Sequence, residues 1–255
     1  MAQLRTMGWT IEGKVARIVF NRPELLNAMN NEGTIEINTI ADAISKEDGV
    51  RLVVITGAGR SFCTGIDLKE LSSGKIEMVY HHRWEHALRI FEGMEKIVIA
   101  GIKEYCLGGG LQLALACDVR VAADNAILGL PAIKESLIPG LATYRLPRYI
   151  GLGRAKRLIL SGEFVHADGA LAMGLVDYVV PLAEFERRLE EIIEKYVRIC
   201  SVATVKSKIL CNRSFEMEYH GVLEKYFELQ EISQNSDDHA EAQRAYLENR
   251  DPVFK

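Results

Sequence analysis

Short apolar runs that alternate with amphipathic segments are the feature of this chain that most restricts its fold. The runs at 50–59 (VRLVVITGAG) and 96–102 (KIVIAGI) are continuously apolar. Strands of a parallel sheet have this pattern, because helices cover both of the sheet's faces. The segments that precede these runs, residues 31–45 and 75–94, carry helical periodicity instead. The alternation therefore predicts an α/β domain with parallel strands.

Other segments extend the same pattern. Thr10–Phe20 contains two short alternating runs on either side of Gly13-Lys14, which is typical of a hairpin. The remaining predicted elements are helices over Gly110–Cys117 and Arg154–Ser161, a strand-turn-strand over 119–131 and a short strand within 174–181. From about Leu182 the pattern changes to amphipathic helices without strands, at 182–200, 201–214 and 221–235. Such a helical region is either a lid or an oligomerisation surface.

Composition excludes several classes of function. The formal net charge is −4, which does not favour binding to nucleic acid. The N-terminus shows no signal-peptide pattern, and no apolar run approaches the ~18 residues of a membrane span. The five cysteines include no CxxC pair, as expected for reduced thiols. We therefore expect a cytoplasmic protein.

Two glycine-containing turns, at 59–71 (GRSFCTGIDLKEL) and 104–115 (EYCLGGGLQLAL), each follow a buried run. Glycine lets a backbone present its N–H groups without a Cβ in the way, and the second turn also opens a helix whose first N–H groups lack partners. Together the turns can point two N–H donors at one oxygen. A tight strand-to-helix turn alone would also explain the GGG. The dinucleotide-binding GxGxxG fingerprint is not present.

Six ordered blocks across nearly the whole chain resemble the enoyl-CoA hydratase/isomerase (crotonase) superfamily. They are NRPELLNAM, VVITGAGRSFCTGIDLKEL, IAGIKEYCLGGGLQLALACDVRVAADNAILGLP, LIPGLATYRLPRYIGLGRAKRLILSGE, ADGALAMGLVDYVVP and RAYLENRDPVFK. The resemblance implies a crotonase-like spiral of ββα units with a C-terminal α-helical trimerisation region. It divides the chain into a spiral core (1–195) and a helical oligomerisation region (196–255). It also implies a homo-oligomer, either a trimer or a dimer of trimers.

The same resemblance assigns the ligand and its contacts. The ligand is an acyl-CoA thioester, with coenzyme A carried as part of the substrate and no separate cofactor. The backbone N–H groups of Ile66 and Gly109 would hold the thioester carbonyl. Leu25 and Leu26 match a loop that flanks the CoA nucleotide. The segment against the adenine is matched by Thr64, Asp67, Leu68 and Lys69.

The chain departs from the family pattern at the acid–base positions. Hydratases of this family use two glutamates, and here their places are taken by Gln112 and Ala132. An amide or a methyl group cannot provide general acid–base catalysis, which is worth about 10²–10⁴ per group. The simple isomerases keep the second glutamate, so Ala132 argues against them as well. The segment IPGLATYRL is also one residue shorter than the IPGxGGTQRL of relatives.

Several residues are candidates to replace the missing glutamates. Glu135 lies three residues after Ala132, and Tyr144 lies on the shortened loop. Four more candidates follow the first turn on a predicted helix: His81, His82, Glu85 and His86. The residues favour a decarboxylase or another non-hydratase reaction, since loss of CO2 itself generates an enolate. The alternatives are a hydratase or isomerase that uses a relocated group such as Glu135, and a non-catalytic acyl-CoA-binding protein.

Overall fold

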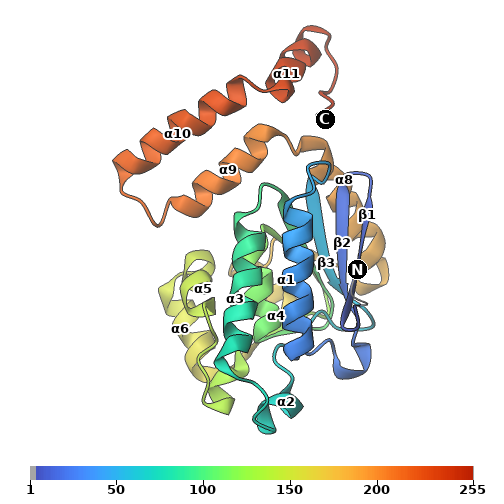
Figure 1. The fold of residues 1–255 in the computed structure, drawn as a ribbon, viewed down its shortest axis with the longest axis vertical. Helices are drawn as coiled ribbons and strands as arrows, with labels where there is room; N and C mark the ends of the chain where they lie inside the picture. The colour runs from blue at the N-terminus through green and yellow to red at the C-terminus, as the bar shows by residue number, and fades with distance from the viewer. Residues whose placement is uncertain (1–3, 255) are drawn as a thin grey trace.

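The computed structural model describes residues 4–254, and a six-stranded sheet forms its centre (Figure 1). Its strands, in spatial order, are β1 (Met7–Glu12), β2 (Val15–Phe20), β3 (Leu52–Gly57), β4 (Ile97–Ile102), β6 (Val119–Ala123) and β9 (Tyr178–Val180). β1 and β2 form the predicted antiparallel hairpin around Gly13-Lys14. The other neighbouring strands of this sheet, from β2 to β9, all pair in parallel. The parallel sheet expected from the apolar runs is therefore present.

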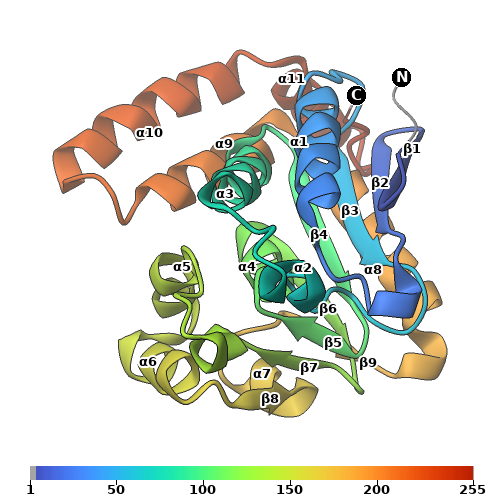
Figure 2. The same cartoon turned by 60° about the horizontal axis from the view of Figure 1, so that its bottom comes forward.

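Helices cover both faces of this sheet (Figure 2). One face carries α1 (Asn31–Ser45), α3 (Met78–Gly93) and α4 (Gly109–Ala116), and the opposite face carries α8 (Phe185–Ile199). Within β3, Val53 and Ile55 belong to the core under the first group, whereas Leu52 and Val54 belong to the core under α8. Burial on both sides explains why these strands are continuously apolar rather than alternating.

A second, three-stranded sheet lies beside the first. It consists of β5 (Tyr105–Leu107), β7 (Ile127–Gly129) and β8 (Phe164–His166), with β5 parallel to β7 and β7 antiparallel to β8. The strand-turn-strand predicted over 119–131 is present, but β6 and β7 belong to different sheets. The division matters for the site, because β5 leads directly into α4 and aligns the glycine turn there.

The structure also contains elements that the periodicity does not reveal. They are the strands β5 and β8, the helices α2 (Leu68–Ser72), α5 (Ala142–Ile150), α7 (Ala167–Ala172) and α11 (Asp237–Leu247), and the 3₁₀ turns η1 (Pro23–Leu25), η2 (Pro131–Glu135) and η3 (Leu182–Glu184). The helix predicted over Arg154–Ser161 is α6 (Leu152–Ser161). Most of the missed elements are too short for periodicity, and α5 contains Pro147, which normally ends a helix.

The C-terminal helices project from this body (Figure 1). α9 (Val202–Arg213) and α10 (Tyr219–Gln234) form an antiparallel pair, and α11 follows them. Buried Lys208 anchors α9 to the core: its ammonium donates to the carbonyls of Phe91 and Lys96 and lies 2.9 Å from Asp118. The boundary predicted after residue 195 falls inside α8, one turn before that helix ends.

None of the helices within residues 4–254 combines the length and the hydropathy that a membrane span requires. In the same range, no group of His, Cys, Asp and Glu side chains is arranged to hold a metal ion. The cysteines are free thiols, and only Cys211 is exposed. Burial raises the pKa of Cys63 to about 12, so that this thiol stays protonated.

Candidate active site

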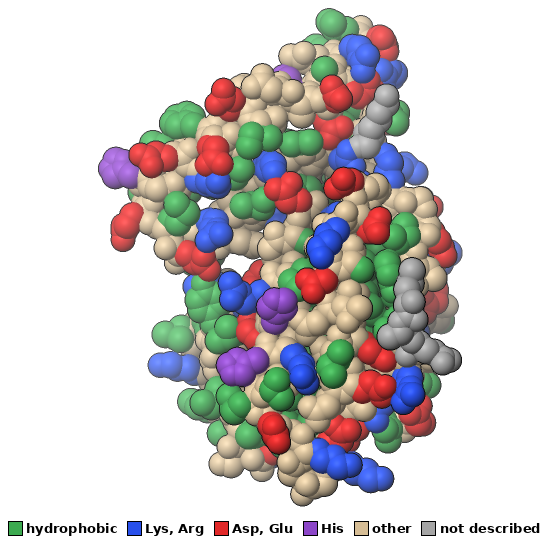
Figure 3. Space-filling model, viewed as in Figure 1, with side chains coloured by type: hydrophobic (Ala, Val, Ile, Leu, Met, Phe, Trp, Pro, Cys, Tyr) green, Lys and Arg blue, Asp and Glu red, His purple; other side chains and the backbone are tan. Residues whose placement is uncertain are grey.

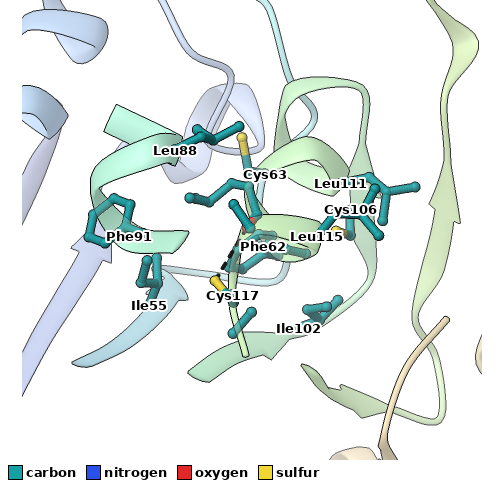
Figure 4. Close-up of a cluster of buried hydrophobic side chains, with 14 of the residues drawn as sticks. Ile55, Phe62, Cys63, Leu88, Phe91, Ile102, Cys106, Leu111, Leu115 and Cys117 are labelled. Carbon is teal, nitrogen blue, oxygen red and sulfur yellow. Dashed lines mark hydrogen bonds between the residues drawn. The ribbon is translucent and has the colours of Figure 1, made fainter. Parts of the chain in front are cut away.

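The two glycine turns lie side by side. The segment that follows β3 runs parallel to β5: Cys63 donates its N–H to the Tyr105 carbonyl (3.0 Å), and Leu107 donates to the Cys63 carbonyl (2.9 Å). A cluster of buried apolar side chains, including Cys63, Cys106 and Leu111, packs beneath the turns (Figure 4). The two turns are about 45 residues apart in the sequence, and these backbone hydrogen bonds hold them next to each other in space.

Both turns leave a backbone N–H without a partner. Around the first, Met29 donates to the Gly65 carbonyl (2.6 Å) and accepts from Asp67 N–H (2.9 Å), while the amide of Ile66 donates to no described residue. In the second, Gly109 is the first residue of α4, and its amide likewise has no acceptor among residues 4–254. Ile66 and Gly109 line the same cavity. Two free donors at one cavity are what an oxyanion-binding site needs.

The close approach of the turns depends on glycine. Gly65 has φ +88°, and a Cβ there would lie 2.7 Å from the Gly109 nitrogen. A Cβ on Gly110 would lie 2.2 Å from the Cys63 carbonyl oxygen. Real Cβ atoms do not approach backbone atoms this closely. Any larger residue must therefore push the turns apart.

We expect Gly110→Ala to lower the free energy of unfolding by about 3 kcal/mol, because the new methyl group collides with backbone that cannot move independently. Urea denaturation followed by circular dichroism measures the loss. Gly93→Ala is the matched control. Gly93 is the last residue of α3, and a Cβ added there would have no neighbour within 4 Å. The variant should be more stable than wild type by up to about 1 kcal/mol, because alanine has the higher helix propensity. Equal stability of the two variants would contradict the close approach.

The cavity has a volume of about 1010 Å³ and a mostly apolar wall. Several large apolar side chains at this cavity are exposed to solvent: Leu68 is 56% exposed, Met78 67% and Ile138 79%. Apolar side chains gathered around a concave site are typical of ligand pockets. The shortened segment contributes Pro139, Gly140 and Leu141 to the wall.

Five of the six predicted CoA-contacting residues line this cavity: Leu25, Thr64, Asp67, Leu68 and Lys69. Leu26 is not among the lining residues, and its carbonyl instead accepts a hydrogen bond from the Thr64 amide (3.2 Å). The contribution of Leu26 is therefore to the backbone of the loop rather than to the cavity wall.

Asp67 has a structural role in the free chain. Its carboxylate accepts hydrogen bonds from the Lys69 and Glu70 amides at the start of α2 and lies 2.9 Å from the Arg22 guanidinium. Burial raises the pKa of the Asp67 carboxyl, but the hydrogen bond from Arg22 and those from the two amides outweigh burial and hold the pKa below its usual value. Asp67 thus fixes α2 against the first glycine turn.

The two positions that the resemblance assigns to the family's glutamates both face the cavity. Gln112 on α4 and Ala132 on η2 line it. The side chain of Gln112 lies against Gly140, where a Cβ would be 2.5 Å from the amide oxygen. The cavity therefore presents a neutral amide and a methyl group where an acid and a base would be needed for hydration.

Two of the candidate replacements, Glu135 and Tyr144, lie in different places relative to the cavity. Glu135 lines the cavity and is exposed, and its carboxylate forms no hydrogen bond or ion pair with another described residue. Tyr144 is not among the residues that line the cavity, and its role as a donor stays a prediction. It lies on α5, and its hydroxyl donates to Glu216 (2.7 Å), so the side chain faces the C-terminal helices instead.

The predicted residues of α3, namely His81, His82, Glu85 and His86, all line the cavity. Glu85 is not free, because Arg145 donates to both of its oxygens (2.6 and 3.1 Å). His86 is bonded through Nδ1 to Asn38 (2.7 Å). Burial, and secondarily His82, lowers the pKa of His81, so its ring is neutral at pH 7.

Four further lining residues on α3 were not predicted: Met78, Tyr80, Trp84 and Arg89. The indole ring of Trp84 packs 3.5 Å from the Cβ position of Gly109, and it is 4% exposed. The apolar periodicity of the helix could indicate Trp84 as a core residue, but no sequence signal distinguishes Arg89 from a surface arginine.

Comparison with known proteins identifies relatives along the whole chain. Residues 10–255 match the family model described as enoyl-CoA hydratase/isomerase. The short-chain-enoyl-CoA hydratase of Clostridium acetobutylicum is 34% identical over 94% of this chain and 93% of its own. The enoyl-CoA hydratase structure from Bacillus anthracis superposes with a TM-score of 0.91 at 34% identity, over 98% of this chain and 99% of that one. The structure of the putative enoyl-CoA hydratase from Streptomyces coelicolor A3(2) superposes with a TM-score of 0.95 at 26% sequence identity, over 100% of this chain and 96% of that one. These matches confirm the predicted fold and the resemblance.

Proposed function

The chain belongs to the enoyl-CoA hydratase/isomerase family, and we propose that it converts an acyl-CoA thioester through an enolate held by the Ile66 and Gly109 amides. The observation that carries this proposal is that both amides lack partners and both residues line one large apolar cavity. An enolate concentrates negative charge on the thioester oxygen. Fixed N–H donors stabilise that charge more than they stabilise the neutral carbonyl, and the difference lowers the barrier.

We further propose that the reaction is not standard hydration, and decarboxylation is the favoured alternative. Hydration needs one group to activate water and another to deliver a proton, and Gln112 and Ala132 supply neither. In a decarboxylation, the bond between Cα and the carboxylate breaks and its electron pair forms the enolate, so the protein needs no base. One proton then returns to Cα from water or from Glu135.

A relocated acid–base group is the second candidate. Glu135 supports it, since this carboxylate lines the cavity without a partner and is free to exchange a proton with substrate or water. Under this reading the chain is a hydratase or isomerase that uses Glu135 in place of the two missing glutamates. The two candidates differ in the substrate that they require.

We also propose that residues 196–255 mediate self-association, as a trimer or a dimer of trimers. Support comes from the projecting helices α9 and α10 and the loop between them, which expose large apolar side chains. Phe215 lies in the loop, and Tyr219 and Phe227 lie on α10. Exposed apolar surface of this kind is typical of protein interfaces. Sedimentation of the full chain measures the assembly.

The test of the reaction compares two thioester classes. We expect CO2 release from malonyl-type thioesters and hydration of crotonyl-CoA far below the family's usual rates, because the acid–base pair is absent. Hydration at ordinary rates that is abolished by Glu135→Gln would establish the second candidate instead. Glu218→Gln, which removes an exposed carboxylate outside the cavity, is the control. Tight binding of every thioester without conversion would show a non-catalytic binder.

A further inference from the structure

We propose that Arg89 binds an anionic group at the far end of the acyl chain, so that the substrates are acyl-CoA thioesters whose acyl group ends in a carboxylate. This inference rests on the proposed function, because it requires the thioester to lie at the Ile66 and Gly109 amides. It goes further by assigning a specificity-determining residue and the chemical class of the acyl group.

Helix α3 gives the position of Arg89 relative to the thioester. The Tyr80 hydroxyl donates to the Met29 carbonyl (3.2 Å), which fixes the first turn of α3 beside the strand bridge to Ile66. One turn later, Trp84 packs against Gly109. Arg89 lies five residues beyond Trp84, which corresponds to about 7.5 Å along the helix. Arg89 therefore lines the cavity beyond the site of the thioester carbonyl.

The CoA-binding residues are expected at the opposite end. Lys69 and Leu68 belong to α2, which lies at the N-terminal end of α3 (Figure 1). Arg89 is near the C-terminal end of the same helix. A thioester that places its nucleotide near α2 and its carbonyl at Gly109 then directs its acyl chain toward Arg89. This order separates Arg89 from the phosphates of coenzyme A.

Arg89 has no partner in the free chain. The carboxylates that normally pair with an arginine on a helix are those three or four residues away, here Glu92 and Glu85. Buried Arg145 holds both of them: it donates to Glu85 at 2.6 and 3.1 Å and to Glu92 at 2.9 and 3.1 Å. The Arg89 side chain forms no hydrogen bond or ion pair with any residue in 4–254, so its guanidinium donors remain available.

The surroundings of Arg89 favour a carboxylate as the ligand. The guanidinium group presents a planar fork that matches the two oxygens of a carboxylate. His82, seven residues earlier on the same face of α3, also lines the cavity. In the space-filling view, histidine and basic side chains gather over this helix (Figure 3). The side chains of Arg89 and His82 are both exposed, so the apolar wall strengthens an ion pair there once a bound acyl chain has displaced water from it.

The test measures binding by calorimetry of hexanoyl-CoA, of adipoyl-CoA and of free CoA. Adipoyl-CoA replaces the terminal methyl group of hexanoyl-CoA with a carboxylate. We expect the wild-type chain to bind adipoyl-CoA about tenfold more tightly than hexanoyl-CoA. Arg89→Gln should abolish this preference and leave the affinities for hexanoyl-CoA and free CoA unchanged. Arg83→Gln, which removes the same charge from the same helix outside the cavity lining, should retain the preference.

Two results would overturn the assignment of Arg89 alone. One is equal affinity of the wild-type chain for hexanoyl-CoA and adipoyl-CoA. The other is a loss of affinity for free CoA in Arg89→Gln, which would place the guanidinium at a phosphate instead. Absence of binding by all three ligands would overturn the proposed function, and the inference with it.

Discussion

Replacing Gly109 with proline is expected to lower the turnover of the thioester substrate by about 10²–10³-fold, the usual cost of removing one oxyanion donor. Gly109 is the first residue of α4, and its amide donates to no described residue. Proline is well tolerated at this helix position, since the lost N–H takes no part in the helix. The substitution therefore removes the proposed oxyanion donor and puts the proline Cδ in place of its hydrogen, while the helix remains.

Gly109→Ala is the matched control, because it adds a Cβ and keeps the N–H. The added Cβ would lie 3.3 Å from the Gly65 Cα and 3.5 Å from the Trp84 ring, which requires only a small adjustment. Both variants are assayed with whichever thioester the wild-type chain converts, and circular dichroism checks their folding. Similar losses in the two variants would show that space, and not the N–H donor, limits the reaction.

The parts of the fold that sequence reasoning predicts are those with strong local signals. The predicted helix over 31–45 coincides with α1, which has apolar periodicity and an Asn30 side chain that accepts a hydrogen bond from Gly33 N–H at its start. In contrast, β5 has only three residues, and its existence depends on pairing with β7. Such an element is stabilised by a partner distant in sequence, so its own residues carry little periodicity.

The same distinction applies to the site. The glycine turns are predictable because backbone N–H groups are oriented by local turn geometry, and glycine marks the turns in which close approach occurs. Side-chain directions depend on packing between elements. Tyr144 lies only four residues after Gly140 of the cavity wall, yet its hydroxyl donates to Glu216 of the C-terminal region. Arg89 is available only because Arg145 holds Glu85 and Glu92, and no local pattern contains that information.

The second large effect is expected from restoring the acid–base pair. We expect the double variant with Gln112→Glu and Ala132→Glu to hydrate crotonyl-CoA at least 100-fold faster than the wild-type chain, because each acid–base group is worth about 10²–10⁴. Both positions line the cavity that contains the two free amides. Repulsion between two carboxylates in one apolar cavity raises the pKa of one of them. The carboxyl with the raised pKa is then the one suited to deliver the proton, and the other stays ionised as the base.

The control for this experiment is Ala132→Gln, which combines the native Gln112 with a second amide of nearly the same size as the glutamate. It fills the cavity as the double variant does but cannot transfer protons, so its hydration rate should stay at the wild-type level. The rate is followed by the loss of the conjugated double bond. A folded double variant that binds crotonyl-CoA without any gain in hydration would mean that the cavity differs from that of a hydratase in more than its acid–base groups. The shortened segment at Gly140, which lies against residue 112, would then be the part of the wall to lengthen.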